Sequence, residues 1–164
     1  MKKLWAPWRI EYILQPKPDG CIFCDKRKEN NDRDNLILYR GKTCFVIMNF
    51  YPYNNGHLLV VPNRHISDIE LLNETEQTEL MKLLTDSSTI LKKVLKSDGL
   101  NIGMNLGRVA GAGIDDHIHF HIVPRWNGDT NFMPVTGNTR VISQGLYECW
   151  DLLSPRFNKL KSPE

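Results

Sequence analysis

Short apolar runs bounded by polar residues recur along the chain, and in residues 117–123 apolar residues alternate with histidines, a pattern typical of a strand with one buried face. They predict strands at residues 35–40, 43–49, 57–62, 100–106 and 117–123. Gly41 and Lys42 would make a tight turn between the first two strands, and Pro62 would end the third. Because the connections among the first three strands are short, we expect an antiparallel meander.

A long helix is predicted between the third and fourth strands. Asn73 is a good N-cap, and Glu76 stands where a capping box needs it. Gly99 has the residue type that favours a left-handed C-terminal cap. A second helix is predicted from Val141 to about Phe157. In the long helix, the apolar residues at helical spacing are Leu80, Leu83, Leu84, Leu91, Val94 and Leu95.

The order β-β-β-α-β-β-α predicts an α+β fold, an antiparallel five-stranded sheet with a long helix and a C-terminal helix covering one face. With 164 residues, of which 41% are hydrophobic, the chain is most simply one domain over residues 1–164. Residues 1–20 carry aromatic residues and prolines and are expected to form a docking arm. Residues 21–158 would then be the core of the domain.

Charge and composition narrow the classes of partner. The net charge of +2 is nearly neutral and the basic residues are scattered, so a nucleic-acid partner is not expected. No apolar run approaches the roughly 20 residues of a membrane span, and no signal segment is evident, so we expect a cytoplasmic protein without membrane contact. Structural disulfides are not expected there, and Cys44 and Cys149 are interpreted as small core residues.

Three of the five histidines, His117, His119 and His121, alternate with apolar residues. On a strand all three imidazoles would line one face while the apolar residues enter the core. The outer pair would lie roughly 13 Å apart on a regular strand, too far to share one zinc ion. Three interpretations follow: a solvated strand face, a metal site, or covalent catalysis by the middle imidazole.

Cys21 and Cys24 have the Cys-x2-Cys spacing that lets two thiolates bind one zinc ion. Two more ligands would come from His57, His65 or the end histidines of the strand. A redox pair is the competing interpretation, but it lacks the expected context of a strand followed by a helix. The pair could also bind nothing.

A glycine-rich loop, residues 105–113, joins the last two predicted strands. Glycines free backbone N–H groups to point at an anion. Asn105 could add an amide donor and Arg108 a positive charge. Beside a nucleophilic histidine the loop is interpreted as a phosphate cradle, and otherwise as a flexible connection.

Together these motifs resemble the histidine triad (HIT) superfamily of nucleotide hydrolases and transferases. The resemblance covers nearly the whole chain: His-x-His-x-His with two apolar residues and Pro-Arg after it, and residues 56–62 and 101–107, which are similar to two further family motifs. Residues 4–9, 51–57 and 124–132 resemble the diadenosine polyphosphate hydrolase and phosphorylase (Fhit-like) branch. The resemblance implies an enzyme that cleaves dinucleoside polyphosphates such as diadenosine tetraphosphate, and a homodimer.

The resemblance assigns catalytic roles to three histidines. His119 matches the nucleophile that attacks an α-phosphorus and forms a nucleotidyl-histidine. His121 matches the histidine that contacts the transferred phosphate, and His57 matches a histidine that supports the catalytic strand.

The resemblance also implies the nucleotide-binding residues and the metal ligands. Asn49 would bind the ribose hydroxyls, and Asn105 the phosphates. The apolar side chains that would wall the base are Ile47 and Leu59, and the glycines expected in the phosphate cradle are Gly111 and Gly113. The ligands implied for a structural zinc ion are Cys21, Cys24, His65 and His117.

One position departs from the family pattern. Gly113 stands four residues before the first triad histidine, where many relatives carry Gln or Ser that contacts phosphate or leaving group. The residue contacting the leaving group is therefore unassigned. Alternatives that remain are a diadenosine tetraphosphate phosphorylase (ATP adenylyltransferase), a nucleoside phosphoramidate hydrolase, a non-catalytic nucleotide sensor, and a zinc hydrolase with the triad as ligands.

Overall fold

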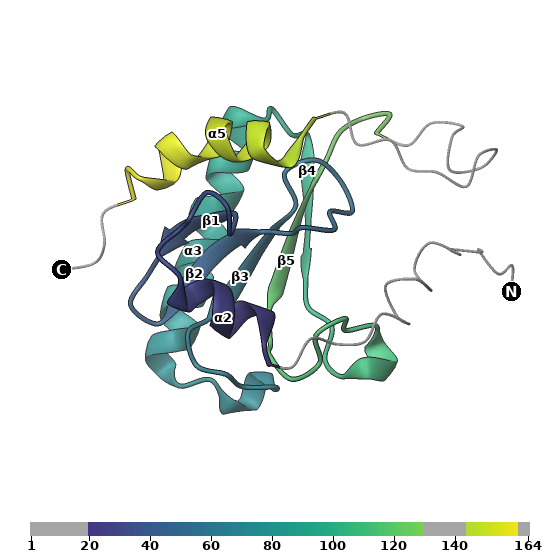
Figure 1. Ribbon diagram of the computed structural model, residues 1–164. Helices are drawn as coiled ribbons and strands as arrows, with labels where there is room; N and C mark the ends of the chain where they lie inside the picture. The colour runs from purple at the N-terminus through teal and green to yellow at the C-terminus, as the bar shows by residue number, and fades with distance from the viewer. Residues whose placement is uncertain (1–19, 130–143, 161–164) are drawn as a thin grey trace, which may run out of the picture.

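A five-stranded sheet is the centre of the computed structural model, which describes residues 20–129 and 144–160 (Figure 1). The strands are β1 (Ile37–Arg40), β2 (Cys44–Met48), β3 (Leu58–Pro62), β4 (Gly99–Gly103) and β5 (Phe120–Arg125). The α-helices are α2 (Ile22–Lys28), α3 (Glu74–Val94) and α5 (Leu146–Phe157), and two short 3-10 helices span Ile69–Leu71 and Arg108–Ala110. The predicted α+β fold, with its antiparallel sheet, long helix and C-terminal helix, is confirmed.

The strands lie in the order β1-β2-β3-β5-β4, and each neighbouring pair is antiparallel. The expected meander of the first three strands is therefore correct. The register places Ile47, Leu59, His121 and Gly103 in one row across β2, β3, β5 and β4. Because paired residues share a face of a sheet, the side chains of this row point to the same side.

Helix α3 covers the opposite face of the sheet, packing on β2, β3 and β5 (Figure 1). The Cys44 thiol of β2 donates to the Glu76 carbonyl of α3, so Cys44 and its alternate neighbours face the helix. On the other face, Phe23 of α2 packs its ring against His117 and His119. The two faces of the sheet thus differ, because one is covered by α3 and the other carries the histidines.

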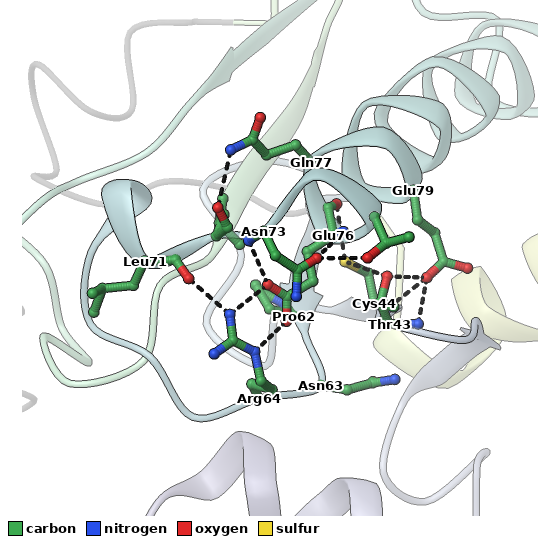
Figure 2. Close-up of polar contacts among 12 residues, drawn as sticks. Thr43, Cys44, Pro62, Asn63, Arg64, Leu71, Asn73, Glu76, Gln77 and Glu79 are labelled. Atoms are coloured by element: carbon green, nitrogen blue, oxygen red, sulfur yellow. Dashed lines mark hydrogen bonds and ion pairs between the residues drawn. The ribbon is translucent and has the colours of Figure 1, made fainter.

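The Glu79 carboxylate of α3 is buried and holds the turn between β1 and β2 (Figure 2). It accepts hydrogen bonds from the backbone N–H groups of Lys42, Thr43 and Cys44 and from the Thr43 hydroxyl. Burial raises the pKa of Glu79, but the hydrogen bonds from this turn outweigh it and leave the pKa below its ordinary value. The carboxylate therefore stays charged at neutral pH.

The Glu76 carboxylate, also buried, holds the segment that leaves β3 (Figure 2). Glu76 and Asn73 form the predicted capping box. The carboxylate also accepts two hydrogen bonds from the Arg64 guanidinium, which donates a third to the Leu71 carbonyl. The predicted helix start is thus correct. The same Glu76 carboxylate also holds Arg64 in the segment that follows β3.

The predicted cap at Gly99 is wrong, because α3 ends earlier. Helix α3 stops at Val94, Lys96 takes the left-handed backbone with a φ of 51°, and Gly99 begins β4. The Leu95 carbonyl accepts a hydrogen bond from the Trp126 indole. A tertiary contact therefore satisfies this helix end where a glycine cap was expected.

Other boundaries also differ from the prediction. The strand expected at 117–123 begins only at Phe120, since the Ile118 N–H donates to the Ile66 carbonyl in the segment after β3. The strand expected at 100–106 ends at Gly103, before the glycine-rich loop. Helix α5 begins at Leu146, where Glu148 accepts from the Gly145 N–H, and the start expected at Val141 lies outside the described residues.

Helix α2, which the sequence did not predict, follows Cys21 directly. Most of the expected N-terminal arm (residues 1–19) and residues 130–143 lie outside the described part, so the extent of arm and domain stays a prediction. Cys44 and Cys149 are fully buried, as expected of small core residues. Among the helices of the described residues, none has the length and apolar character needed to span a bilayer.

Replacing Glu79 with alanine should destabilise the fold by about 3 kcal/mol, because three backbone N–H groups lose their acceptor. Urea unfolding at pH 7 measures this, with the exposed Glu74→Ala on the same helix as control. Since the pKa of Glu79 is lowered in the folded state, its contribution is complete above its ordinary pKa and is lost as pH falls through the lowered pKa. Equal midpoints for the two variants at pH 7 would contradict this assignment.

Candidate functional site

Two cysteines and two histidines meet beside the sheet. Cys21 precedes α2, Cys24 lies on it, His65 follows β3, and His117 precedes β5. One ligand atom from each lies within 4.8 Å of the others. Cys21 Sγ is 3.1 Å from His117 Nδ1, and Cys24 Sγ is 3.5 Å from His65 Nδ1 and 3.6 Å from His117 Nδ1. Sulfur and nitrogen ligands of a tetrahedral zinc ion lie about 3.6 Å apart, so these residues could hold a metal ion.

A backbone carbonyl decides which nitrogen of His117 faces the sulfurs. The Pro62 carbonyl is 3.0 Å from His117 Nε2 and can only accept a hydrogen bond, so Nε2 carries the proton. The lone pair then lies on Nδ1, the atom closest to Cys21 and Cys24. This tautomer is the one that a metal ligand needs.

Of the possible histidine ligands considered from the sequence, His65 and His117 join the cysteines, and His57 does not. Asp116 lies on the far side of His65, with its carboxylate 3.9 Å from Nε2. Such a carboxylate behind a ligating imidazole favours the tautomer with the lone pair toward the metal. The redox interpretation requires a strand followed by a helix. A helix, α2, does follow Cys21, but the two cysteines lie beside two imidazole nitrogens, which is the environment of a metal site.

A chain of hydrogen bonds orients His57 and His121. The Tyr53 backbone N–H donates to His57 Nδ1, so the proton of His57 is on Nε2. His57 Nε2 then donates to His121 Nδ1, 3.0 Å away, which places the proton of His121 on Nε2. His121 Nε2 is buried and has no hydrogen-bond partner among the described residues. The His121 Nε2–H is therefore already oriented to donate to an acceptor atom of a ligand.

His119 has the opposite tautomer. Its Nδ1 lies 2.9 Å from the His117 carbonyl and must donate to it, so the lone pair is on Nε2. The ring packs between Phe23 and His121, with centroids 5.1 Å and 4.9 Å away. The site thus combines one imidazole with a lone pair available for attack and one with an N–H available for donation.

Burial keeps these imidazoles neutral. The pKa of His57 is lowered to about 3 and that of His121 to about 4. Burial is the larger cause of both shifts, and the neighbouring imidazoles add to it. Burial also lowers the pKa of His119, although its bond to the His117 carbonyl opposes the shift. A neutral imidazole is the nucleophilic form, so the site suits attack on an electrophile at neutral pH.

The side chains expected to wall a base lie next to the histidines. Ile47 and Leu59 are buried in the same row as His121, on β2 and β3. Asn49 lies beside His57, with its Nδ2 3.3 Å from His57 Nδ1, and its Oδ1 accepts from the Tyr51 N–H. The sheet thus gathers these three residues on one side of the triad.

The glycine-rich loop lies on the other side, after β4. Gly107 and Gly111 have positive φ values of 76° and 95°, which favour glycine. Asn105 lines a groove together with His121, and its amide is 3.5 Å from the Gly111 carbonyl. Gly113 is exposed in the same loop. The roles expected of Asn105, Gly111 and Gly113 stay predictions.

Sequence reasoning missed several groups that orient the histidines. Two are backbone groups, the Pro62 carbonyl and the Tyr53 N–H. Every residue has a backbone carbonyl and every residue but proline has a backbone N–H, so no side-chain pattern reveals them. The third is Phe23, which is buried against His117 and His119. Its signal was available, as an aromatic residue between two cysteines expected to bind metal.

The HIT domain family model matches residues 30–128 of the chain. An "AP-4-A phosphorylase" from Mycobacterium tuberculosis is 36% identical over 96% of this chain and 85% of its own length. A "Bis(5'-nucleosyl)-tetraphosphatase [asymmetrical]" from Schizosaccharomyces pombe is 32% identical over 57% of this chain and 50% of its own length.

Among solved structures, a Zn-bound histidine triad family protein from Mycobacterium smegmatis superposes with a TM-score of 0.69. It is 24% identical, and the match covers 86% of this chain and 95% of that protein. At this identity the likeness concerns the fold, and it agrees with the sheet and helices described above.

Proposed function

The chain belongs to the HIT domain family, and from this premise we propose that it is an enzyme that cleaves dinucleoside polyphosphates through a nucleotidyl-histidine at His119. The observation that carries the proposal is the opposite tautomers of two adjacent imidazoles. The His119 lone pair is on Nε2, and His121 presents an Nε2–H. The names of the relatives support the substrate class, diadenosine tetraphosphate above all.

The first step would transfer a nucleotide to the protein. His119 Nε2 attacks the α-phosphorus and forms a P–N bond, while the P–O bond to the remaining phosphates breaks and a nucleoside polyphosphate leaves. The His121 N–H donates to a phosphoryl oxygen, where negative charge gathers in the transition state. His57 supports this donor, because it accepts from Tyr53 and donates to His121.

The second step would release the nucleotide. Inorganic phosphate or water attacks the same phosphorus, the P–N bond breaks, and the imidazole regains its lone pair. Phosphate as acceptor gives ADP from the adenylyl group, and water gives AMP. The 36% identity to a protein named AP-4-A phosphorylase, over nearly the whole chain, favours phosphate. Water is the second candidate, favoured by the tetraphosphatase relative.

The residues that would bind the base and ribose lie on one side of the histidines, and those that would bind the phosphates lie on the other. Ile47 and Leu59 would contact the base and Asn49 the ribose, since they lie with His57 toward β2 and β3. The phosphates would lie toward the loop after β4, where Asn105 could supply an amide donor and Gly113 a backbone N–H. The Gly111 N–H donates to the Arg108 carbonyl, so Gly111 would contribute the left-handed turn that shapes this loop. Support for these assignments is their placement on either side of His121.

We further propose that Cys21, Cys24, His65 and His117 hold a structural zinc ion. When bound, zinc would supply a cross-link between α2 and the segments flanking β3 and β5. The chain itself holds His117 through the hydrogen bond to the Pro62 carbonyl. The His117 carbonyl then keeps its position as the acceptor for His119 Nδ1.

A homodimer and a cytoplasmic location stay predictions. The outer edge of β4, where Ile102 is exposed, supports the homodimer.

The catalytic proposal predicts the products of diadenosine tetraphosphate. With phosphate we expect ADP and ATP, and without it slow formation of AMP and ATP, both separated by ion-exchange chromatography. His119→Ala should reduce the rate by roughly 10⁴-fold or more, and His121→Ala by roughly 10²–10³-fold. Binding of the substrate without cleavage by the unmodified protein would favour a nucleotide sensor, and full activity of His119→Ala would exclude this mechanism.

The zinc proposal predicts one zinc ion per chain in purified protein, measured by elemental analysis. Cys21→Ser should lose the ion and lower the melting temperature, because a ligand is removed from the cross-link. His119→Ala should retain it, since His119 lies outside the ligand group. Loss of zinc from His119→Ala would favour the zinc hydrolase, in which the triad itself binds metal.

A further inference from the structure

A groove with a volume of about 260 Å³ lies on the β4 side of His121. Its lining includes Tyr53, Asn101, Gly103, Asn105 and His121. The register pairs Gly103 with His121 and Asn101 with Val123, so the groove is on the same face of the sheet as the triad. None of the roles given above to the base, the ribose or the metal ion uses this groove.

The position of the groove matches the second half of a dinucleotide. Ile47 and Leu59 lie on one side of His121, on β2 and β3, and the groove lies on the other, along β4. A substrate whose first base lies over β2 and β3, with its α-phosphorus at the triad, has its remaining phosphates and second nucleoside available to extend toward β4. The attacked phosphorus separates these two halves, since attacking and leaving groups lie roughly in line.

Tyr53 supplies an aromatic surface at this groove. Its ring is stacked on His121 at a centroid separation of 5.8 Å with an interplanar angle of 22°, and it lies 4.8 Å from the His57 ring. One face of the ring therefore rests on the imidazoles, yet the residue is 42% exposed. Aromatic rings held in this way bind bases by stacking, with little preference among them.

Polar groups complete the groove. The Asn101 side-chain oxygen Oδ1 accepts from Arg125, whose guanidinium also donates to Asp129. The amide nitrogen is then the end of Asn101 that can donate to a ligand. Together with Asn105, it gives the groove two amides beside an aromatic ring, which suits a nucleoside bearing phosphates.

We propose that Tyr53 and the β4 groove form the subsite for the leaving nucleoside of the substrate, with the second base stacked on the Tyr53 ring. This inference rests on the proposed cleavage of dinucleoside polyphosphates and adds to it how the leaving group is recognised. Tyr53 is then a specificity-determining residue, whose ring distinguishes a dinucleotide from a mononucleotide with the same phosphates.

The test compares kcat/KM for diadenosine tetraphosphate and adenosine 5′-tetraphosphate, which lacks only the second adenosine. Tyr53→Leu should lower the ratio of the two values about tenfold, as expected for loss of one base–aromatic stack, whereas Tyr53→Phe should preserve it. Tyr51→Leu is the matched control, an exposed tyrosine of the same loop that is absent from the groove lining. It should leave the ratio unchanged.

Equal losses on both substrates in Tyr53→Leu would overturn the subsite, because the ring would then only support the imidazoles. An unchanged ratio would overturn it as well. If Tyr53→Leu does not fold, Tyr53→Trp replaces it: its larger ring should raise the ratio or keep it, and a tenfold fall would count against stacking. Failure of the proposed function is distinct, since the unmodified protein would then release no AMP or ADP from either substrate.

Discussion

The hydrogen bond from His119 Nδ1 to the His117 carbonyl is the interaction on which the rest of the site depends. It leaves the lone pair on Nε2, the nitrogen that a nucleophilic role requires. The carbonyl is itself fixed through the side chain of its residue, because His117 donates to the Pro62 carbonyl and turns Nδ1 toward the cysteines. Residue 117 thus links the candidate metal ligands to the nucleophile by its backbone, so it need not touch the substrate.

The long helix contributes to this arrangement from the opposite face of the sheet. Glu76 holds Arg64, and Arg64 lies between Pro62, whose carbonyl orients His117, and His65, a candidate metal ligand (Figure 2). A charge-assisted bidentate contact with a buried carboxylate gives a segment without regular structure a defined position. The capping box at the start of α3 therefore does more than begin a helix, since its Glu76 also fixes the segment that contacts the histidines.

The sequence was sufficient for the sheet, the long helix and the grouping of the site, because these depend on periodicity and side-chain type. Asn73 and Glu76 marked the helix start, and the spacing of Cys21 and Cys24 predicted a metal site, whose geometry the structure supports. Boundaries set by tertiary contacts were not predictable. At the end of α3, Lys96 takes the left-handed position without a glycine and the Trp126 indole donates to the Leu95 carbonyl. Before Phe120, the Ile118 N–H donates to the Ile66 carbonyl, outside the sheet. The tautomers depend on backbone groups and carry no sequence signal.

Long-range ¹H–¹⁵N NMR of the imidazoles near pH 7 tests the central claim most directly, because it reports which ring nitrogen of each histidine carries the proton. We predict a proton on Nδ1 of residue 119 and on Nε2 of residue 121, with both rings neutral, and His119→Ala identifies the first set of signals. A proton on Nε2 of residue 119 would contradict the account, since the nitrogen assigned to attack phosphorus would then have no lone pair.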